Sequence, residues 1–590
     1  MQDVVKYLKW EITERGARII GCDEKFEGAM EIPSRLDGVP VVEIGKEAFS
    51  KRHSLKSVAI PDSVEVVGEA AFAECGRLQE LHLGAGIKKI ETAAFSRCQS
   101  LKCVAVPDSV EDVGEGAFAW CSGLNELWLG RGIKKIEKDA FCMCDSLKSV
   151  AIPDSVEVVG EGAFAWCSGL NELWLGRGIK KIEREAFLWC SSLKSVVIPD
   201  SVEVVGEVAF AFCVGLNELR LGRGIKKIET NAFAKCVSLQ SVVIPGSVEV
   251  VGEAAFVECD GLKELRLGAG IKTIEEGAFG KCVSLQSVVI PGSVEVVGER
   301  AFERRYGLNE LRLGRGINRI ENYAFWSCSS LKSVEIPGTV ESVGEDAFSH
   351  CGELEELQLG AGIKKIEKNA FRQCCSLKSV AIPGTVEVVG EEAFDDCAEL
   401  EELQLGAGIK KIEKYAFRQC RSLKSVEIPG TVESVGEWAF SACSELEELQ
   451  LGVGIKEIEY GAFASCSSLK SVEIPGTVES VGEDAFSRCG ELEELQLGAG
   501  IKRIEKGAFT SCSSLKTVAI PDSVEVVGEC AFQKCSGLEE LRLGEGIKTI
   551  EEDAFRDCSS LRRVVLPSTL EALARDAFDE RVNLVVDDER

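Results

Sequence analysis

Apolar residues recur along this chain with a spacing of 23 residues. Leu55 begins the first regular copy, and a leucine follows at every twenty-third position as far as Leu584, without insertion or deletion. A typical copy reads L-x-x-[LV]-x-[LI]-[PG], then [VI]-x-x-[VI], then A-F-x-x-C. A short period repeated this often predicts one solenoid, in which each unit packs on its neighbours, and not several separate domains.

Within a copy, apolar and polar residues alternate with period two over the first six positions, which predicts a short strand. In the first copy Leu55, Val58 and Ile60 are expected to face inward, and the following Pro or Gly ends the strand. Val64 and Val67 bury a second short segment, and the phenylalanine adds a ring from a brief helical turn. Such a unit cannot bury its own apolar face, so we expect stacked parallel strands about 4.8 Å apart.

The ends of the chain depart from the regular pattern. Residues 1–54 predict an N-terminal cap, in which "WEITERGARIIGC" forms a hairpin, followed by a stretched first repeat. Residues 55–560 form the solenoid proper, with 23-residue units paired into 46-residue units. Residues 561–590 supply a C-terminal repeat and an atypical, polar cap, which a solenoid needs to cover its open end.

The segment "LKSVAIPDSVEVVGEAAFAEC" (residues 55–75) resembles the BspA-like, or treponemal-type, leucine-rich repeat family, and the likeness covers nearly the whole chain. The commoner leucine-rich repeat has Asn or Cys where this chain has Ser63 or Gly86. The resemblance implies a right-handed superhelix with one continuous parallel β-sheet on the concave face and short strand and helical-turn segments on the convex side. It also implies protein binding, because many members are cell-surface adhesins or surface proteins, although others are intracellular.

The copies alternate between two types, so the true period is 46 residues, and residues 117–137 recur unchanged as residues 163–183. Odd copies, beginning with that of Leu55, read "LKSV…VEVVGE", and even copies, beginning with that of Leu78, read "LxEL…IKKIE". Glu65 of an odd copy therefore corresponds to Lys88 of an even one. Opposite charges on neighbouring strands attract by a few tenths to about 1 kcal/mol per exposed pair. The alternation is thus explained by electrostatics, without a ligand.

Composition narrows the choice of partners. The net charge of −29 argues against nucleic acid and against an anionic membrane surface. No apolar run approaches the roughly 18 to 20 residues that a membrane span needs, so we expect no membrane insertion. The first residues, "MQDVVKYLKWEITERG", lack the features of a secretory signal. We therefore expect a cytoplasmic protein if the chain is complete, and a cell-surface or secreted one if a signal peptide was removed.

The chain has 26 cysteines, most of them three residues after the repeat phenylalanine, from Cys75 to Cys558. We expect this column to be buried and reduced, because parallel side chains point alike rather than toward each other. Isolated Cys pairs and three histidines predict no metal site. Arg305 and Arg581 interrupt the column. Because an unpaired buried charge is costly, we expect Arg305 to reach solvent or an acidic neighbour.

No catalytic motif is present, and we expect neither catalytic residues nor a cofactor. The sequence has no G-x-S-x-G, P-loop or H-E-x-x-H pattern. The G-x-G of "LGAGIKK" follows a strand but leads to a short segment, without the third glycine and long helix of a dinucleotide site. The protein is therefore predicted not to be an enzyme.

One exposed strand position varies in an ordered way, the fourth residue after the leucine in even copies. In the first half the interleaved odd copies place Ala or Val there, and in the second half the position holds Gln and Glu. Trp and Arg are enriched at interface hot spots, so we predict a protein-binding row made of Trp128, Trp174, Arg220, Arg266 and Arg312. The Glu/Gln half should matter less, since its alternating charges satisfy one another. Trp120, Trp166 and Trp189 are expected to pack along an edge instead.

The leading hypothesis is a non-enzymatic scaffold that binds a protein of unknown identity through its concave face. A cell-surface adhesin or surface antigen is one alternative, and a structural subunit or spacer of a larger assembly is another. Repeat duplication also copies tryptophans that have no role in binding, and this explanation of the row stays open.

Overall fold

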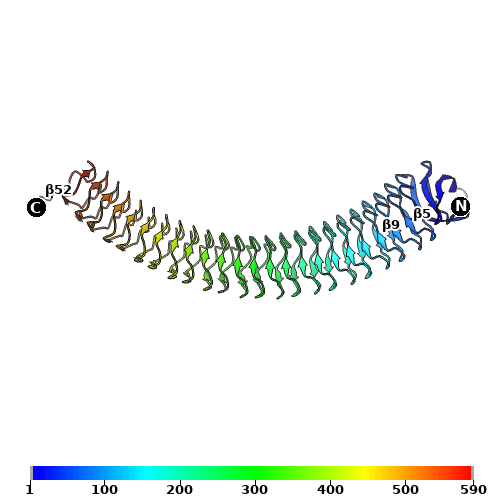
Figure 1. Ribbon diagram of the computed structural model, residues 1–590, viewed down its shortest axis with the longest axis horizontal. Helices are drawn as coiled ribbons and strands as arrows, with labels where there is room; N and C mark the ends of the chain where they lie inside the picture. The colour runs from blue at the N-terminus through cyan, green and yellow to red at the C-terminus, as the bar shows by residue number, and fades with distance from the viewer. Residues whose placement is uncertain (1–3, 587–590) are drawn as a thin grey trace. The chain divides into compact units, whose positions relative to one another are not determined.

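The computed structural model describes residues 4–586. These residues form two compact units, which meet in the sequence between Val294 and Glu295. Each unit is a parallel β-solenoid in which successive 23-residue turns stack on one another (Figure 1). The described chain contains one helix, the 3-10 turn η1 (Val5–Tyr7). No helix within residues 4–586 combines the length and apolar character that a transmembrane segment requires.

Every regular turn contributes two short strands. The first follows the repeat leucine and is usually three residues long, as in β10 (Cys103–Ala105), β12 (Glu126–Trp128) and β14 (Ser149–Ala151). We call the exposed side of these strands the strand face. The second is the Val-Val or Lys-Ile pair that follows, as in β7 (Val66–Val67) and β9 (Lys89–Ile90).

The two ladders differ in continuity, which refines the expectation of a single parallel sheet. The two-residue strands pair without interruption from β7 to β25 (Thr273–Ile274) in the first unit. They do so from β27 (Val296–Val297) to β51 (Ala572–Leu573) in the second. The strands of the strand face pair less evenly, so the second ladder is the more regular of the two ladders in each solenoid.

An antiparallel hairpin lies at the N-terminal end of the described chain. Strands β1 (Leu8–Ile12) and β2 (Ala17–Cys22) pair antiparallel, and β2 then pairs in parallel with β5 (Val39–Ile44), where the second ladder begins (Figure 1). At the other end β50 (Arg563–Leu566) pairs with β52 (Asn583–Val586). The hairpin thus covers the edge of the ladder that would otherwise leave N–H and C=O groups unpaired.

The core consists of columns of identical side chains. The repeat leucines and phenylalanines are almost all fully buried. Neighbouring phenylalanine rings stack nearly parallel, with centroids 4.7 Å apart for Phe49 and Phe72 and 5.5 Å apart for Phe164 and Phe187. Such stacks continue through each unit, so the ring that each turn contributes is covered by the rings of its neighbours.

The segment around each phenylalanine is a run of turns, and the brief helical turn expected there is not found in the described chain. Ala70 and Glu74 have left-handed backbone conformations, with φ of 50° and 62°, and most other turns repeat this pair of positive φ values four residues apart. The Phe72 N–H donates to the carbonyl oxygen of Ala94, one turn on, at 2.7 Å. Backbone groups that a helix would pair internally are therefore paired between turns.

The cysteine column is buried, as predicted. Each column thiol donates to the carbonyl oxygen of the phenylalanine 26 residues earlier, at Sγ–O distances of 3.1 to 3.5 Å. All 26 cysteines are free thiols in the structure. That they are reduced in the native protein stays a prediction, which thiol titration of the denatured protein without reductant would test.

Arg305 contradicts the expectation that it reaches solvent or an acidic neighbour. Its side chain is 0% exposed, and its Nε, Nη1 and Nη2 atoms have no hydrogen-bond partner in the part of the chain that the structure describes. The guanidinium carbon lies 6.0 Å from the centroid of the Phe302 ring. The turn keeps its usual backbone bond, from the Leu308 N–H to the Arg305 oxygen at 3.2 Å. The Arg305 side chain thus stays inside, at the column position that a cysteine thiol occupies in other turns.

Candidate binding surface on the strand face

Trp128 and Trp174 lie on the strand face of the first unit, as predicted. They end β12 and β16 (Glu172–Trp174), and their side chains are 55% and 56% exposed. Each is paired in register with an alanine of the preceding strand, Ala105 or Ala151. Neither indole makes a ring contact within residues 4–586. Both are therefore large apolar surfaces that the fold leaves uncovered.

Arginines continue this row. Arg220 and Arg266 are exposed at the ends of β20 (Glu218–Arg220) and β24 (Glu264–Arg266), in register with Val197 and Val243. Those two valines are 58% and 57% exposed. Arg312 holds the same place on β28 (Glu310–Arg312) of the second unit. The structure thus places the predicted types on the strand face, with small apolar neighbours beside the arginines of the first unit.

The tryptophans beside the Phe–Cys corner pack along an edge, as predicted. The Trp166 and Trp189 rings stack with centroids 5.1 Å apart, and Trp189 stacks on Phe212 at 4.3 Å. The Arg97 guanidinium lies 5.2 Å from the centroid of the Trp120 ring. These rings are engaged by neighbours, in contrast to Trp128 and Trp174.

In the second unit the expected neutralisation of charge holds for some rows only. Lys424 forms an ion pair with Glu401 at 2.8 Å, and Lys378 forms one with Glu355 at 3.5 Å. In each pair the glutamate follows the leucine of an even copy, and the lysine follows the leucine of the next odd copy. The next carboxylates on the strand face, such as Glu427 and Glu473, are exposed and form no ion pair within the described residues. The expectation that all charges of this half satisfy one another is therefore wrong.

The strand face also has repeating clefts, which the sequence did not reveal. An odd strand pairs along its whole length with the even strand after it, as β38 (Ser425–Glu427) does with β40 (Glu448–Gln450). An even strand shares a single residue pair with the odd strand after it, as β36 (Glu402–Gln404) does with β38. The sheet therefore separates at the C-terminal end of every such even-to-odd step.

Glycines explain this separation. A Cβ atom on Gly406 would lie 2.4 Å from the Pro383 oxygen, and one on Gly408 would lie 2.0 Å from the Gly384 oxygen. The even turn therefore packs tightly against the odd turn before it. On Gly430, in the next odd turn, the nearest atom to a Cβ would be Val453 Cγ2, at 3.7 Å, which belongs to the turn that follows.

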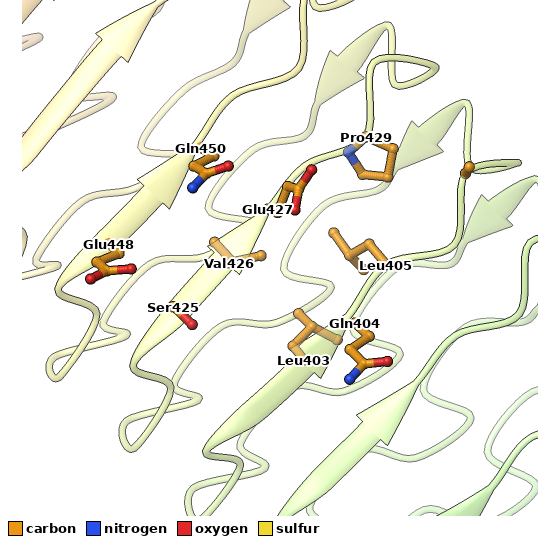
Figure 2. Close-up of a pocket in the computed structure, with 10 residues that line it drawn as sticks. Leu403, Gln404, Leu405, Ser425, Val426, Glu427, Pro429, Glu448 and Gln450 are labelled. Atoms are coloured by element: carbon orange, nitrogen blue, oxygen red, sulfur yellow. The ribbon is translucent and has the colours of Figure 1, made fainter.

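Four clefts of this kind have volumes of about 420 to 680 Å³. One lies in the first unit between β24 and β26 (Ser287–Val289). The other three lie in the second unit, beside β28, β36 and β40. Figure 2 shows the cleft beside β36, where Gln404, Glu427 and Gln450 come from three successive strands around Leu405 and Pro429.

No cluster of metal ligands is assembled in the described residues. No three His, Cys, Asp or Glu side chains converge there as ligands. His350 lies edge-on to Trp326 with ring centroids 5.8 Å apart, and its burial lowers its pKa. Burial likewise raises the pKa of Cys142 to about 12, so this thiol is protonated at neutral pH.

The strand face, the 23-residue turn and the buried leucine columns define a leucine-rich-repeat solenoid. The family model described as the BspA type leucine rich repeat region (6 copies) matches residues 42–171, 180–309, 297–420, 364–493 and 479–585. The chain belongs to this family, which confirms the resemblance seen in the sequence.

Several solved structures are similar to the chain. A leucine-rich cell surface protein from Faecalibacterium prausnitzii is 25% identical, with a TM-score of 0.34, over 60% of this chain and 93% of its own. A leucine-rich repeat protein from Bacteroides ovatus is 22% identical, with a TM-score of 0.31, over 83% and 98%. The pneumococcal vaccine antigen PcpA is 17% identical, with a TM-score of 0.34, over 65% and 92%. No curated protein has a significantly similar sequence.

Proposed function

We propose that this protein is a non-enzymatic scaffold that binds a protein partner through its strand face. The proposed contacts are Trp128, Trp174, Arg220 and Arg266 of the first unit, with Arg312 at the same position of its turn in the second. The observation that carries the proposal is the contrast between two sets of tryptophans. Trp166 and Trp189 are stacked, whereas Trp128 and Trp174 are more than half exposed and have no ring partner in the described chain.

The chemistry of the row suits a protein interface. Large exposed rings next to alanines can bury area on binding without displacing a neighbour. Arginine guanidinium groups add directed donors for carboxylates or carbonyl oxygens. Such anchors carry most of the binding energy in many interfaces.

The test compares two double variants in affinity purification with quantitative mass spectrometry. W128A/W174A removes the exposed rings, and W166A/W189A removes a stacked pair from the same unit. A partner should be retained by the parent and by the edge variant, and should bind W128A/W174A more weakly by at least about 2 kcal/mol, the usual hot-spot threshold. Equal retention by all three proteins, or unfolding of W128A/W174A, would contradict the proposal.

A cell-surface adhesin or antigen is the second candidate, and membership of the BspA type family favours it. The cytoplasmic expectation has no comparable support. The relative from Faecalibacterium prausnitzii is described as a cell surface protein. Binding of the purified chain to immobilised extracellular matrix proteins, lost in W128A/W174A, would support this candidate. Protection of the protein from protease added to intact cells of its source would oppose it.

A further inference from the structure

Two clefts of the second unit, those beside β36 and β40, combine three features that together indicate a ligand. Each is open at the strand face, has a half-exposed leucine such as Leu405 or Leu451 in its lining, and carries carboxylates that the fold does not neutralise. Glu427 and Glu448 line the cleft beside β36, and Glu473 and Glu494 line the one beside β40. None of these four has an ion-pair partner within residues 4–586.

Charge neutralisation stops at the mouth of these clefts. Between β36 and β38 the only paired residues are Glu402 and Ser425, at the N-terminal ends of the strands. At the same end Lys424 forms an ion pair with Glu401. Toward the C-terminal end the strands part, and the side chains there are Glu427 and the amides of Gln404 and Gln450. The step is therefore closed and neutral at one end, and open and negative at the other, so its occupant should be cationic.

The spacing of the clefts restricts the shape of the ligand. Equivalent clefts are two strands apart, which corresponds to about 9.6 Å for strands about 4.8 Å apart. A polyproline II helix rises about 3.1 Å per residue and has three residues per turn, so it presents every third side chain on one side at intervals of about 9.3 Å. An extended β-strand presents side chains on one side at about 6.6 Å and would lose register after one cleft.

We propose that the strand face around β36 and β40 binds a basic, proline-rich segment of a partner protein in the polyproline II conformation. The segment runs across the strands, with Lys or Arg at every third position entering successive clefts. The basic groups meet Glu427 and Glu473 and donate to the glutamine amide oxygens, and the intervening proline rings pack on Leu405, Leu451 and Pro429. The clefts beside β36 and β40 share no residue with the proposed row, which ends at Arg312, so the two proposals stand or fall independently.

The test uses the full chain and two labelled peptides of equal composition. One is (Lys-Pro-Pro)5, which repeats lysine every third residue. The other is (Lys-Pro)5 followed by five prolines, which places lysines at every second residue. Fluorescence anisotropy titrations at low salt should show that the first peptide binds at least about fivefold more tightly, because only its lysines match the cleft spacing. Equal affinities, or no binding of the first peptide, would overturn the proposal.

Matched variants locate the site. E427Q/E473Q removes the two cleft carboxylates, and E433Q/E479Q removes two exposed carboxylates from the same turns, six residues later and on the other ladder. The first should weaken binding of (Lys-Pro-Pro)5 by about tenfold, the sum of two exposed charge pairs, and the second by less than about twofold. Equal weakening in both variants would show attraction to the general acidity of the chain and would overturn the proposal.

Discussion

At the scale of single residues, the residue type varies at the exposed positions of the repeat and hardly changes in its buried columns. The position four residues after the repeat leucine holds Trp, Arg, Gln, Glu, Ala or Val, because its side chain faces outward. The column positions accept almost no change, and Arg305 shows what an exception looks like. It keeps the turn geometry but is a buried cation without a hydrogen-bond partner in the described residues.

Replacing Arg305 by Cys should therefore stabilise the second unit. The change removes an unpaired buried guanidinium and places a small thiol there, as in most other turns, so the free energy of unfolding should rise by about 2 to 4 kcal/mol. Urea denaturation of both proteins measures the difference. R304A is the control, because Arg304 stacks over the Trp326 ring at 5.1 Å and its loss should be neutral or slightly destabilising. A lower stability of R305C than of the parent would contradict this account.

The buried thiols should make the protein sensitive to alkali. Burial raises the pKa of Cys213 from 9.0 to about 12. Above pH 9 this thiol ionises in the unfolded chain but not in the folded one, so its contribution to stability is complete below pH 9 and is lost as the pH rises toward 12. The loss at pH 10 is about 1.4 kcal/mol for this thiol. Denaturation at pH 8 and pH 10 should therefore show a smaller decrease for C213A than for the parent, and equal decreases would refute the assignment.

At the scale of elements, the sequence predicted the strands well and the corner poorly. Period-two alternation located the three-residue strand and its inward residues, and the valine pair located the second segment. The helical turn predicted for the corner does not form, although "AAFAEC" contains good helix formers. Hydrogen bonds between turns, such as that from the Phe72 N–H to the Ala94 oxygen, prevail over this local preference. The clefts could not be predicted from strand periodicity, because they depend on which of its two neighbours a turn packs against. The sequence signal for this packing is the alternation of Pro-Gly turns with Gly-x-Gly turns.

This asymmetry can be tested with two glycines in neighbouring turns. G408A would place a Cβ atom 2.0 Å from the Gly384 oxygen, which is backbone and cannot yield easily. Overpacking of this kind should cost about 1 to 3 kcal/mol. G384A meets no atom closer than 4.0 Å and should be neutral or slightly stabilising. Thermal unfolding distinguishes them, and similar melting temperatures for the two variants would show that the turns do not pack as described.

At the scale of the whole molecule, the functional repeat is the pair of turns. Ion pairs on the second ladder join odd to even copies, as between Glu387 and Lys410 at 2.9 Å, and those at the strand start join even to odd copies, as between Glu401 and Lys424 at 2.8 Å. Both sets of ion pairs form only when odd and even copies alternate. The close packing of each even glycine turn on an odd turn depends on the same alternation.

Deletions should reveal this period. Removing residues 377–422, one odd and one even copy, leaves an even copy followed by an odd one and should lower the melting temperature by only a few degrees. Removing residues 400–422 alone stacks two odd copies. Pro429 would then take the place of Gly406 against the Pro383 oxygen, and Lys424 would lie next to Lys378. That protein should unfold at a clearly lower temperature or fail to fold, and equal stability of the two deletions would contradict the pairing of turns.

The stacking of turns has a mechanical consequence. Within each unit, hydrogen bonds join each turn to the adjacent turns, as from the Phe72 N–H to the Ala94 oxygen and from the Cys75 thiol to the Phe49 oxygen. A force applied between the chain ends therefore acts on one interface between turns at a time. Detaching one turn releases 23 residues, which adds roughly 80 Å of extended chain. A stretched unit should lengthen in equal steps and dissipate work at each, while the turns that remain stay folded.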